Sequence, residues 1–443
     1  VEASDRLGGG TRSSELTLPG LLHDECSGFH PLSLDTPFSR AFDLEAEGLT
    51  WLWPEVQFSH PLDDGRGGAV WQDVARTAQS LGDDGARWRG VFGALAERFD
   101  KIAPEFLQPV LHVPRHPVAL GRFGAFSALP TQVLARAWRT EEGRALVAGL
   151  GAHSFRPLSS PFSSAIGVAL GTAAHRYGWP VARGGSQSIA DAMVAAGRRR
   201  GVRYETGRLV SSLDELDRPD VVLLDTSPAA AVDIVGSRMP GRVARAYRRY
   251  RHGPGSFKVD YAVEGGVPWT HEPTRSAGTV HVGGTLQEIA LAERQVASGR
   301  MPERPFVLVG QQSVADPGRA VDGVVPLYTY AHVPAGFQGD ATEAITAQVE
   351  RFAPGFRDRV RAVAVTSTTE LSRKNPNYVG GDIVTGANDA LQLVFRPRAT
   401  LSPYATGVPG VFLCSAATPP GAGAHGMCGF HGAHAALAEL GLG

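Results

Sequence analysis

The chain has 443 residues, enough for more than one hydrophobic core. Its formal net charge of -1 gives no basic field that would favour nucleic acid as a partner. No apolar run approaches the roughly 18 residues of a membrane-spanning helix, and the cysteines, Cys26, Cys414 and Cys428, are too widely spaced for a disulfide framework or a zinc motif. We therefore expect a cytoplasmic protein, with peripheral membrane contact as the minority alternative.

The first residues predict an acidic strand tip followed by a glycine turn. A carboxylate at the position of Glu2 can accept hydrogen bonds from both hydroxyls of a ribose. The glycines from Gly8 to Gly10, followed by Thr11, would let the backbone approach a pyrophosphate, and Arg6 would offset phosphate charge or anchor the turn. The alternative is an ordinary glycine turn after a surface strand.

The next part of the chain predicts mainly helices. An apolar stripe that includes Trp88, Phe92 and Phe99 recurs at helical spacing within residues 69–100. Further helical pieces are expected around residues 130–150 and 163–176, in a stretch rich in proline, glycine and aromatic residues.

A second set of elements follows Gly184-Gly185-Ser186. The pattern predicts a helix that ends at Arg198-Arg199-Arg200 and Gly201, since cations and glycine favour a helix C-terminus. A short strand is expected at Val202–Glu205, and a buried strand at Val221–Leu224.

Strands dominate the pattern from about residue 256 onward. We expect strands at residues 257–263, 306–309, 324–330 and 411–414, a helix that carries Ile345, Val349 and Phe352, and a terminal helix from about 425 to 440.

The turn before the terminal helix, Gly421-Ala-Gly423-Ala-His-Gly426, matches G-x-G-x-x-G between a strand and a helix. Too few residues follow Gly426 for the second strand and ribose-binding acid of a Rossmann unit, so it is not the first turn of one. We interpret it as a closing turn whose amides face phosphate or the electron-rich edge of a flavin. Close packing of the helix through small residues is compatible with that role.

Four segments in this order resemble the phytoene desaturases, the amine oxidases and their relatives. They are the acid and glycines of residues 2–9, the Gly-Gly helix start at 184–192, the segment 207–210, and the strand and turn at 412–423. The resemblance spans nearly the whole chain and is strongest for the phytoene dehydrogenase-like branch that includes pyridine nucleotide-disulfide oxidoreductase domain-containing protein 2.

The resemblance implies an α/β fold with a Rossmann-like FAD-binding domain of the glutathione-reductase type and an inserted α+β substrate domain. That family also begins with a strand and a G-x-G-x-x-G turn before the acid; neither precedes Glu2, so we expect the FAD domain to be N-terminally truncated and FAD affinity to be reduced. The FAD contacts implied by the resemblance are Glu2, Arg6, Gly8, Gly9, Gly10, Thr11, Val210, Ser227, Ala416, Gly421, Ala422, Gly423, Gly426 and Met427.

The expected FAD domain is discontinuous and comprises residues 1–60, 183–250 and 376–443. The expected substrate domain comprises residues 61–182 and 251–375. The resemblance implies FAD-dependent oxidation of a hydrophobic small molecule, such as the desaturation of a polyisoprenoid or carotenoid-like compound. The alternatives are a flavin-dependent isomerase or saturase, and a non-catalytic interaction protein that has lost the cofactor.

Three histidines near the C-terminus, His425, His431 and His434, could suggest a metal site. Packing or solvent exposure is the favoured interpretation, because no carboxylate is near them in the sequence. No paired acids, P-loop or Ser/His/Asp order is apparent, so no catalytic base is predicted. This pattern is typical of flavin enzymes, in which the cofactor carries the difficult chemistry.

Overall fold

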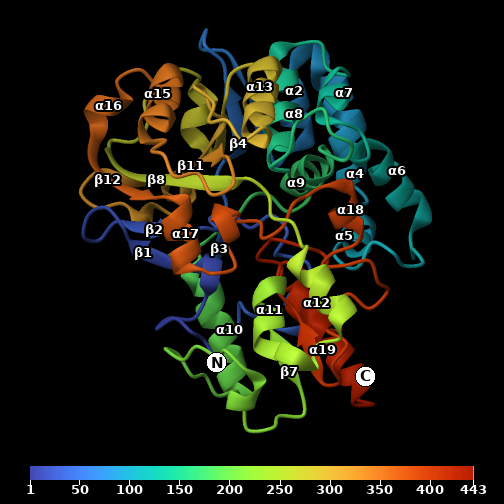
Figure 1. The fold of residues 1–443 in the computed structure, drawn as a ribbon. Helices are drawn as coiled ribbons and strands as arrows, with labels where there is room; N and C mark the ends of the chain where they lie inside the picture. Colours follow the sequence, from blue (N-terminus) through green and yellow to red (C-terminus); the bar gives the residue numbers. More distant parts are fainter. Residues whose placement is uncertain (443) are drawn as a thin grey trace.

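The computed structural model describes residues 1–442. A mixed seven-stranded sheet organises the larger, upper part of the molecule in Figure 1. Its strand order is β12-β8-β11-β10-β9-β4-β5, and neighbours are antiparallel except for the parallel pair β4 and β9. The strands are β4 (Val56–Pro61), β5 (Gly67–Trp71), β8 (Gly255–Glu264), β9 (Ala277–Val282), β10 (Val307–Gly310), β11 (Val324–Val333) and β12 (Val360–Thr366).

The two faces of this sheet pack against different helices because side chains alternate along each strand. On one face, Val259, Val280 and Val309 form a core with α15 (Thr342–Phe352). On the other face, Leu308, Tyr328 and Tyr330 share a core with residues of α8 (Glu141–Ala152) and α9 (Ala165–Arg176). This second face also borders the cavity described below.

A helical layer covers the second face, at the upper right of Figure 1. Trp88, Phe92 and Phe99 are fully buried there, which confirms the apolar stripe expected from the sequence. The expected start of the helices at residue 69 is wrong: β5 runs to Trp71, and helix begins only after Asp73 caps α2. Additional helices are α2 (Val74–Ser80), α3 (Gly85–Trp88), α4 (Ala94–Ala96), α5 (Phe99–Phe106), α6 (Pro117–Ser127), α7 (Thr131–Ala135) and α13 (Leu286–Ala297).

The smaller, lower part of Figure 1 contains both chain ends. Here β7 (Val222–Leu224) and β13 (Val411–Leu413) pair in parallel, although almost 200 residues separate them in sequence. Leu224 and Leu413 pack with Val232 and Val243 in one core. The surrounding helices are α10 (Gln187–Arg199), α11 (Pro228–Val235), α12 (Gly241–Arg248) and α19 (Met427–Glu439).

The N-terminal segment lies beside residues 205–208. Glu2 N donates to the Glu205 carbonyl at 2.7 Å, and Arg208 N donates to the Glu2 carbonyl at 3.0 Å. The expected strands at Val1–Glu2 and Val202–Glu205 are nevertheless wrong as regular strands, because so few bonds join the two segments that each remains an extended stretch. The chain then forms a hairpin from β1 (Ser13–Glu15) and β2 (Leu22–Asp24).

Short elements complete the described part of the chain. They are β3 (Trp51–Leu52), β6 (Val181–Ala182), α1 (Pro37–Ala41), α14 (Gln312–Ala315), α16 (Phe356–Arg359), α17 (Thr368–Lys374) and α18 (Ala390–Val394). Among residues 1–442, no helix combines the length and apolar character needed to cross a bilayer.

Candidate functional site

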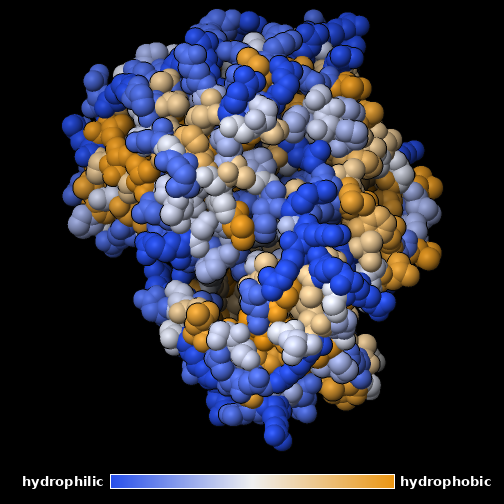
Figure 2. Space-filling view, in the orientation of Figure 1, coloured by the Kyte–Doolittle hydropathy of each residue, from blue (hydrophilic) through white to orange (hydrophobic). Residues whose placement is uncertain are grey.

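A cavity of about 1660 Å³ lies where the two parts of the molecule meet. Its opening is visible in Figure 2 as a recess between the larger upper and smaller lower part, with apolar side chains at its rim. Residues from both chain ends, from both parallel strands and from the second face of the large sheet line it. Its volume exceeds that of most small-molecule pockets and suits an extended ligand or two ligands together.

The structure brings nearly all of the sequence-predicted contact residues to this one cavity. Those that line it are Glu2, Gly8, Gly9, Gly10, Thr11, Val210, Ser227, Ala416, Gly421, Ala422, Gly423, Gly426 and Met427. They come from three regions that are remote in sequence, residues 2–11, 210–227 and 416–427, so their convergence is a property of the tertiary fold.

Arg6 is the exception, because it is not among the residues that line the cavity. Its Nη2 donates to the Ser13 carbonyl at 3.1 Å and to Gln187 Oε1 at 3.2 Å. Of the two roles suggested by the sequence, this geometry fits an anchor between the N-terminal turn, the β1–β2 hairpin and α10.

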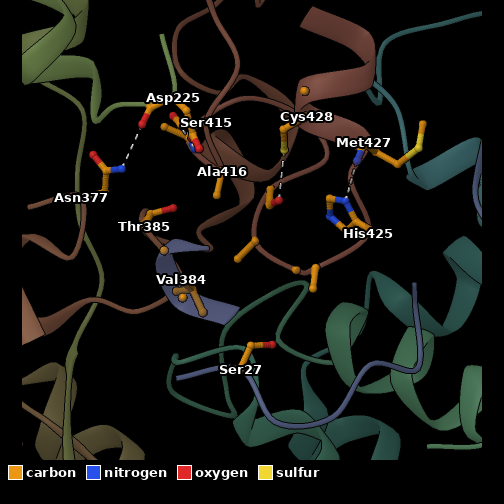
Figure 3. A pocket seen from close by; sticks show the side chains of 18 of the residues that line it. Ser27, Asp225, Asn377, Val384, Thr385, Ser415, Ala416, His425, Met427 and Cys428 are labelled. Atoms are coloured by element: carbon orange, nitrogen blue, oxygen red, sulfur yellow. Dashed lines mark hydrogen bonds between the residues drawn. The ribbon is translucent and has the colours of Figure 1, made fainter. Parts of the chain in front are cut away.

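Two carboxylates lie at the same end of the cavity. Asp225 follows β7, and its side chain is exposed where it lines the cavity. Enclosure by the protein around the cavity, and then the nearby charge of Glu2, raises the pKa of Asp225 to about 6. One oxygen of Glu2 accepts a hydrogen bond from Ser4 N at 2.7 Å. Asn377 Nδ2 donates to the backbone carbonyl of Asp225, as Figure 3 shows, and not to the Asp225 carboxylate. Two close carboxylates suit a ligand that brings hydroxyl donors.

A buried guanidinium lies beside the glycine turn. Arg396 is 3% exposed and donates to the carbonyls of Gln392 and Ala416 and to Asn388 Oδ1, at 3.1, 3.3 and 3.0 Å. These acceptors are neutral, and within residues 1–442 no carboxylate pairs with it. A buried charge without a counter-ion is costly unless a ligand of opposite charge offsets it. Arg396 therefore marks a place for negative charge.

The turn before α19 folds closely around its own glycines. Gly421, Gly423 and Gly426 have φ values of +110°, +140° and +72°, which strongly favour glycine. A Cβ on Gly421 would lie 2.4 Å from Arg396 Nη1, so glycine permits the guanidinium to approach. Met427 N donates to His425 Nδ1 at 3.0 Å, and burial lowers the pKa of His425 to about 4 (Figure 3). His425 therefore braces the turn as a neutral imidazole.

The remaining C-terminal histidines face protein rather than one another. His431 Nε2 hydrogen-bonds the Leu107 carbonyl at 3.0 Å, and the exposed His434 packs edge-on against Phe430. Cys428, buried at the start of α19, donates to the Gly421 carbonyl at 3.3 Å. These contacts support packing roles.

Sequence reasoning missed Asp225, Arg396 and His153, which also lines the cavity. Asp225 could have been found, because it directly follows the predicted buried strand at Val221–Leu224, and Glu2 was predicted as an acid at the tip of a strand. Arg396 and His153 lie in irregular or helical segments without a motif, and only the fold shows that they face the cavity.

No family model matches the chain. Pyridine nucleotide-disulfide oxidoreductase domain-containing protein 2 from Mus musculus is 30% identical over 158 residues, which cover 32% of this chain and 27% of the relative. The protein of the same name from Rattus norvegicus has the same identity and coverage. The chain therefore matches only about a quarter of the length of these curated relatives.

Similar solved structures cover almost the whole chain. A double mutant of putrescine oxidase matches with a TM-score of 0.58 and 15% identity, over 99% of this chain and 92% of that one. An oxidoreductase from Methanosarcina mazei gives 0.60 and 12% identity, over 96% and 91%. Cyclohexylamine oxidase from Brevibacterium oxydans gives 0.52 and 16% identity, over 99% and 92%. The α/β FAD-oxidoreductase fold expected from the sequence is confirmed: the chain has the fold of the flavin amine oxidases.

Proposed function

We propose that the protein is an FAD-dependent oxidoreductase that acts on an apolar small molecule. The observation that carries this proposal is the convergence, in one cavity, of two carboxylates, a glycine-rich turn and a buried guanidinium that pairs with no carboxylate of residues 1–442. The carboxylates can accept hydrogen bonds from hydroxyls, the glycine turn lets the backbone approach a pyrophosphate, and the guanidinium can receive negative charge. FAD offers all three groups.

The residues present fit FAD. Glu2 would accept hydrogen bonds from the ribose, Val210 would meet the adenine through its main chain, and Arg396 with the turn at Gly421 would receive negative charge on the cofactor. When bound, FAD accepts the two electrons of a hydride from a C–H bond. The protein's own contribution is to orient the substrate and to exclude water.

The substrate part of the cavity is apolar. Its walls from α5, α6 and α9, and from the loop before β6, include Phe106, Phe123, Ile166, Leu170 and Trp179. Burial of a hydrocarbon there would contribute about 25 cal/mol per Å² of apolar area. The resemblance to phytoene desaturases supports desaturation of a polyisoprenoid or carotenoid-like compound as the reaction.

Reconstitution with FAD and with FMN tests the cofactor proposal. Glu2→Ala should weaken FAD retention about tenfold or more, because a ribose contact is lost, and should leave FMN retention unchanged, since FMN has no adenosine. Flavin absorbance after gel filtration measures both. Equal FAD content in the wild type and Glu2→Ala would contradict the role of Glu2, and no binding of either flavin to the wild type would refute the proposal.

Anaerobic mixing with an apolar alkene tests the reaction. Loss of the oxidised flavin absorbance on mixing supports net oxidation. Turnover with the flavin spectrum unchanged and no acceptor present would instead support an isomerase.

A further inference from the structure

The floor of the cavity is formed by one face of three neighbouring strands. Thr279 on β9 pairs with Gly310 on β10, which pairs with Tyr328 on β11. Two residues along each strand, His281, Leu308 and Tyr330 are paired in the same way. Directly paired residues project to the same face of a sheet, so these two rows lie side by side. Thr279, Leu308, Tyr328 and Tyr330 line the cavity.

A pair of histidines stands at one edge of this floor. His153, which follows α8, brings its Nε2 to 2.9 Å from Nε2 of His281. His153 also lines the cavity, whereas His281 lies behind it, wedged against Gly149 of α8. The imidazole of His153 therefore separates His281 from the cavity.

The hydrogen-bond network assigns the proton between these two rings. His281 Nδ1 is buried and has no partner, and Gly149 packs directly against it. A buried N–H without an acceptor is rare, so Nδ1 holds the lone pair and Nε2 of His281 donates. His153 then accepts at Nε2, and its remaining proton is on Nδ1. His60 shows the same arrangement: its Nε2 faces the Gly284 carbonyl at 2.7 Å, and its Nδ1 is unpartnered.

Both rings are neutral over the physiological pH range. Burial lowers the pKa of His153 to about 3, with a smaller contribution from His332, and burial also lowers the pKa of His281 far below its usual range. His153 thus offers the cavity a neutral N–H donor.

Two further polar groups of the floor lack protein partners. Among residues 1–442, Thr279 Oγ1 and Gln312 Nε2 have no hydrogen-bond partner, although the two residues are only 1% and 3% exposed, and both line the cavity. Gln312 lies over Gly310, because a Cβ on that glycine would be 3.1 Å from its amide. Gly310 is the pairing partner of Thr279. A buried polar group without a partner costs roughly 1–3 kcal/mol, which a ligand could recover.

These groups share one hydrogen-bonding character. The His153 N–H and Gln312 Nε2 can only donate, and the Thr279 hydroxyl can donate. The acid nearest to the apolar walls, Glu105, is already engaged by His112 at 2.6 Å and by His116 N at 2.8 Å. The floor therefore suits an uncharged acceptor, and Glu105 is not free to pair with a cation there.

We propose that the substrate of this site is an uncharged, apolar molecule with a carbonyl oxygen, which the His153 N–H, Gln312 and Thr279 receive at the sheet floor. This inference rests on the proposed oxidoreductase function and specifies its substrate class. It separates the protein from oxidases of charged amines, whose substrates bring several donors and no acceptor. The hydrocarbon part of the molecule would occupy the apolar walls.

Displacement of Nile red from the purified full chain tests this inference with three ligands of equal length: methyl hexyl ketone, octane and octylamine. We expect the ketone to bind about tenfold more tightly than octane, as one good hydrogen bond predicts, and octylamine to bind more weakly than the ketone. His153→Phe should abolish the ketone preference and leave octane binding unchanged. His434→Phe, a change at an exposed residue that does not line the cavity, should change neither.

Octane binding reports whether each variant is folded around the cavity. If His153→Phe does not bind octane, His153→Gln replaces it, because an amide can both accept from His281 and donate into the cavity; it should keep the ketone preference. Tightest binding of octylamine, or a ketone preference that survives in His153→Phe, would overturn the inference. Flavin content is measured on the same samples, so a colourless protein with the ketone preference would refute the proposed function alone.

Discussion

Replacement of Arg396 by methionine removes the buried guanidinium and keeps an unbranched apolar side chain. Arg396 donates to uncharged acceptors, so without cofactor the change loses three hydrogen bonds from a charged donor, about 1.5–3 kcal/mol each. Relief from burying an unpaired charge, which costs several kcal/mol per ion, offsets most of that loss. With cofactor, the change also loses a hydrogen bond to a charged group, worth about 1.5–3 kcal/mol. We therefore expect FAD affinity to fall roughly tenfold to a hundredfold.

Arg319 provides the matched comparison. Its guanidinium is 1% exposed, donates to Asp24 at 2.6 Å and Asp316 at 3.1 Å, and is not among the cavity-lining residues. Arg319→Met removes the cation that pairs with these two carboxylates and should lower the free energy of unfolding by about 3–5 kcal/mol.

Thermal melts of both variants with and without added FAD separate the two effects. Arg319→Met should have the lower melting temperature without FAD and should keep the FAD-induced rise. Arg396→Met should melt closer to the wild type and lose most of that rise. Retention of the full FAD-induced rise by Arg396→Met, or a melting temperature below that of Arg319→Met without FAD, would contradict the proposed role of Arg396.

Two further changes test the site and its support. Asp225→Asn should stabilise the cofactor-free protein above about pH 7. There the wild-type carboxylate is ionised, and its raised pKa of about 6 means that the folded state disfavours this charge. Since the pKa of this carboxyl in the unfolded chain, 3.8, is lower, the free energy of unfolding of the wild type should rise as the pH falls through 6 and should equal that of the variant near pH 4. A difference in urea unfolding that stays constant with pH would contradict this. Gly149→Ala would place a Cβ 2.7 Å from the His281 ring and should destabilise the protein by about 1–3 kcal/mol. Gly121→Ala, whose Cβ meets open space on α6, should be neutral or stabilising. Equal urea-unfolding midpoints for the two variants would show that α8 can move away from His281.

The sequence by itself indicated the α/β class, most of the long elements and the segments that meet at the cavity. Periodicity identified the stripe of Trp88 and Phe99 because a helix repeats its buried face within a few residues. The glycines at 421–426 were informative for a similar reason, since unusual backbone angles depend mainly on the local residue type. By contrast, the extended segment at 202–205 has strand-like alternation but lacks the pairing that would make it a regular strand.

Only the tertiary structure decided which remote residues share the cavity. Asp225 gains its raised pKa from the protein that encloses the cavity and from Glu2, which lies more than 200 residues away in sequence. His153 becomes a neutral donor because β9 places His281 against it. In the described part of the chain, the fold surrounds the Arg396 guanidinium with uncharged acceptors and no carboxylate pairs with it. Charge state and hydrogen-bonding role depend on neighbours and burial, and these are set by long-range packing that no local pattern records.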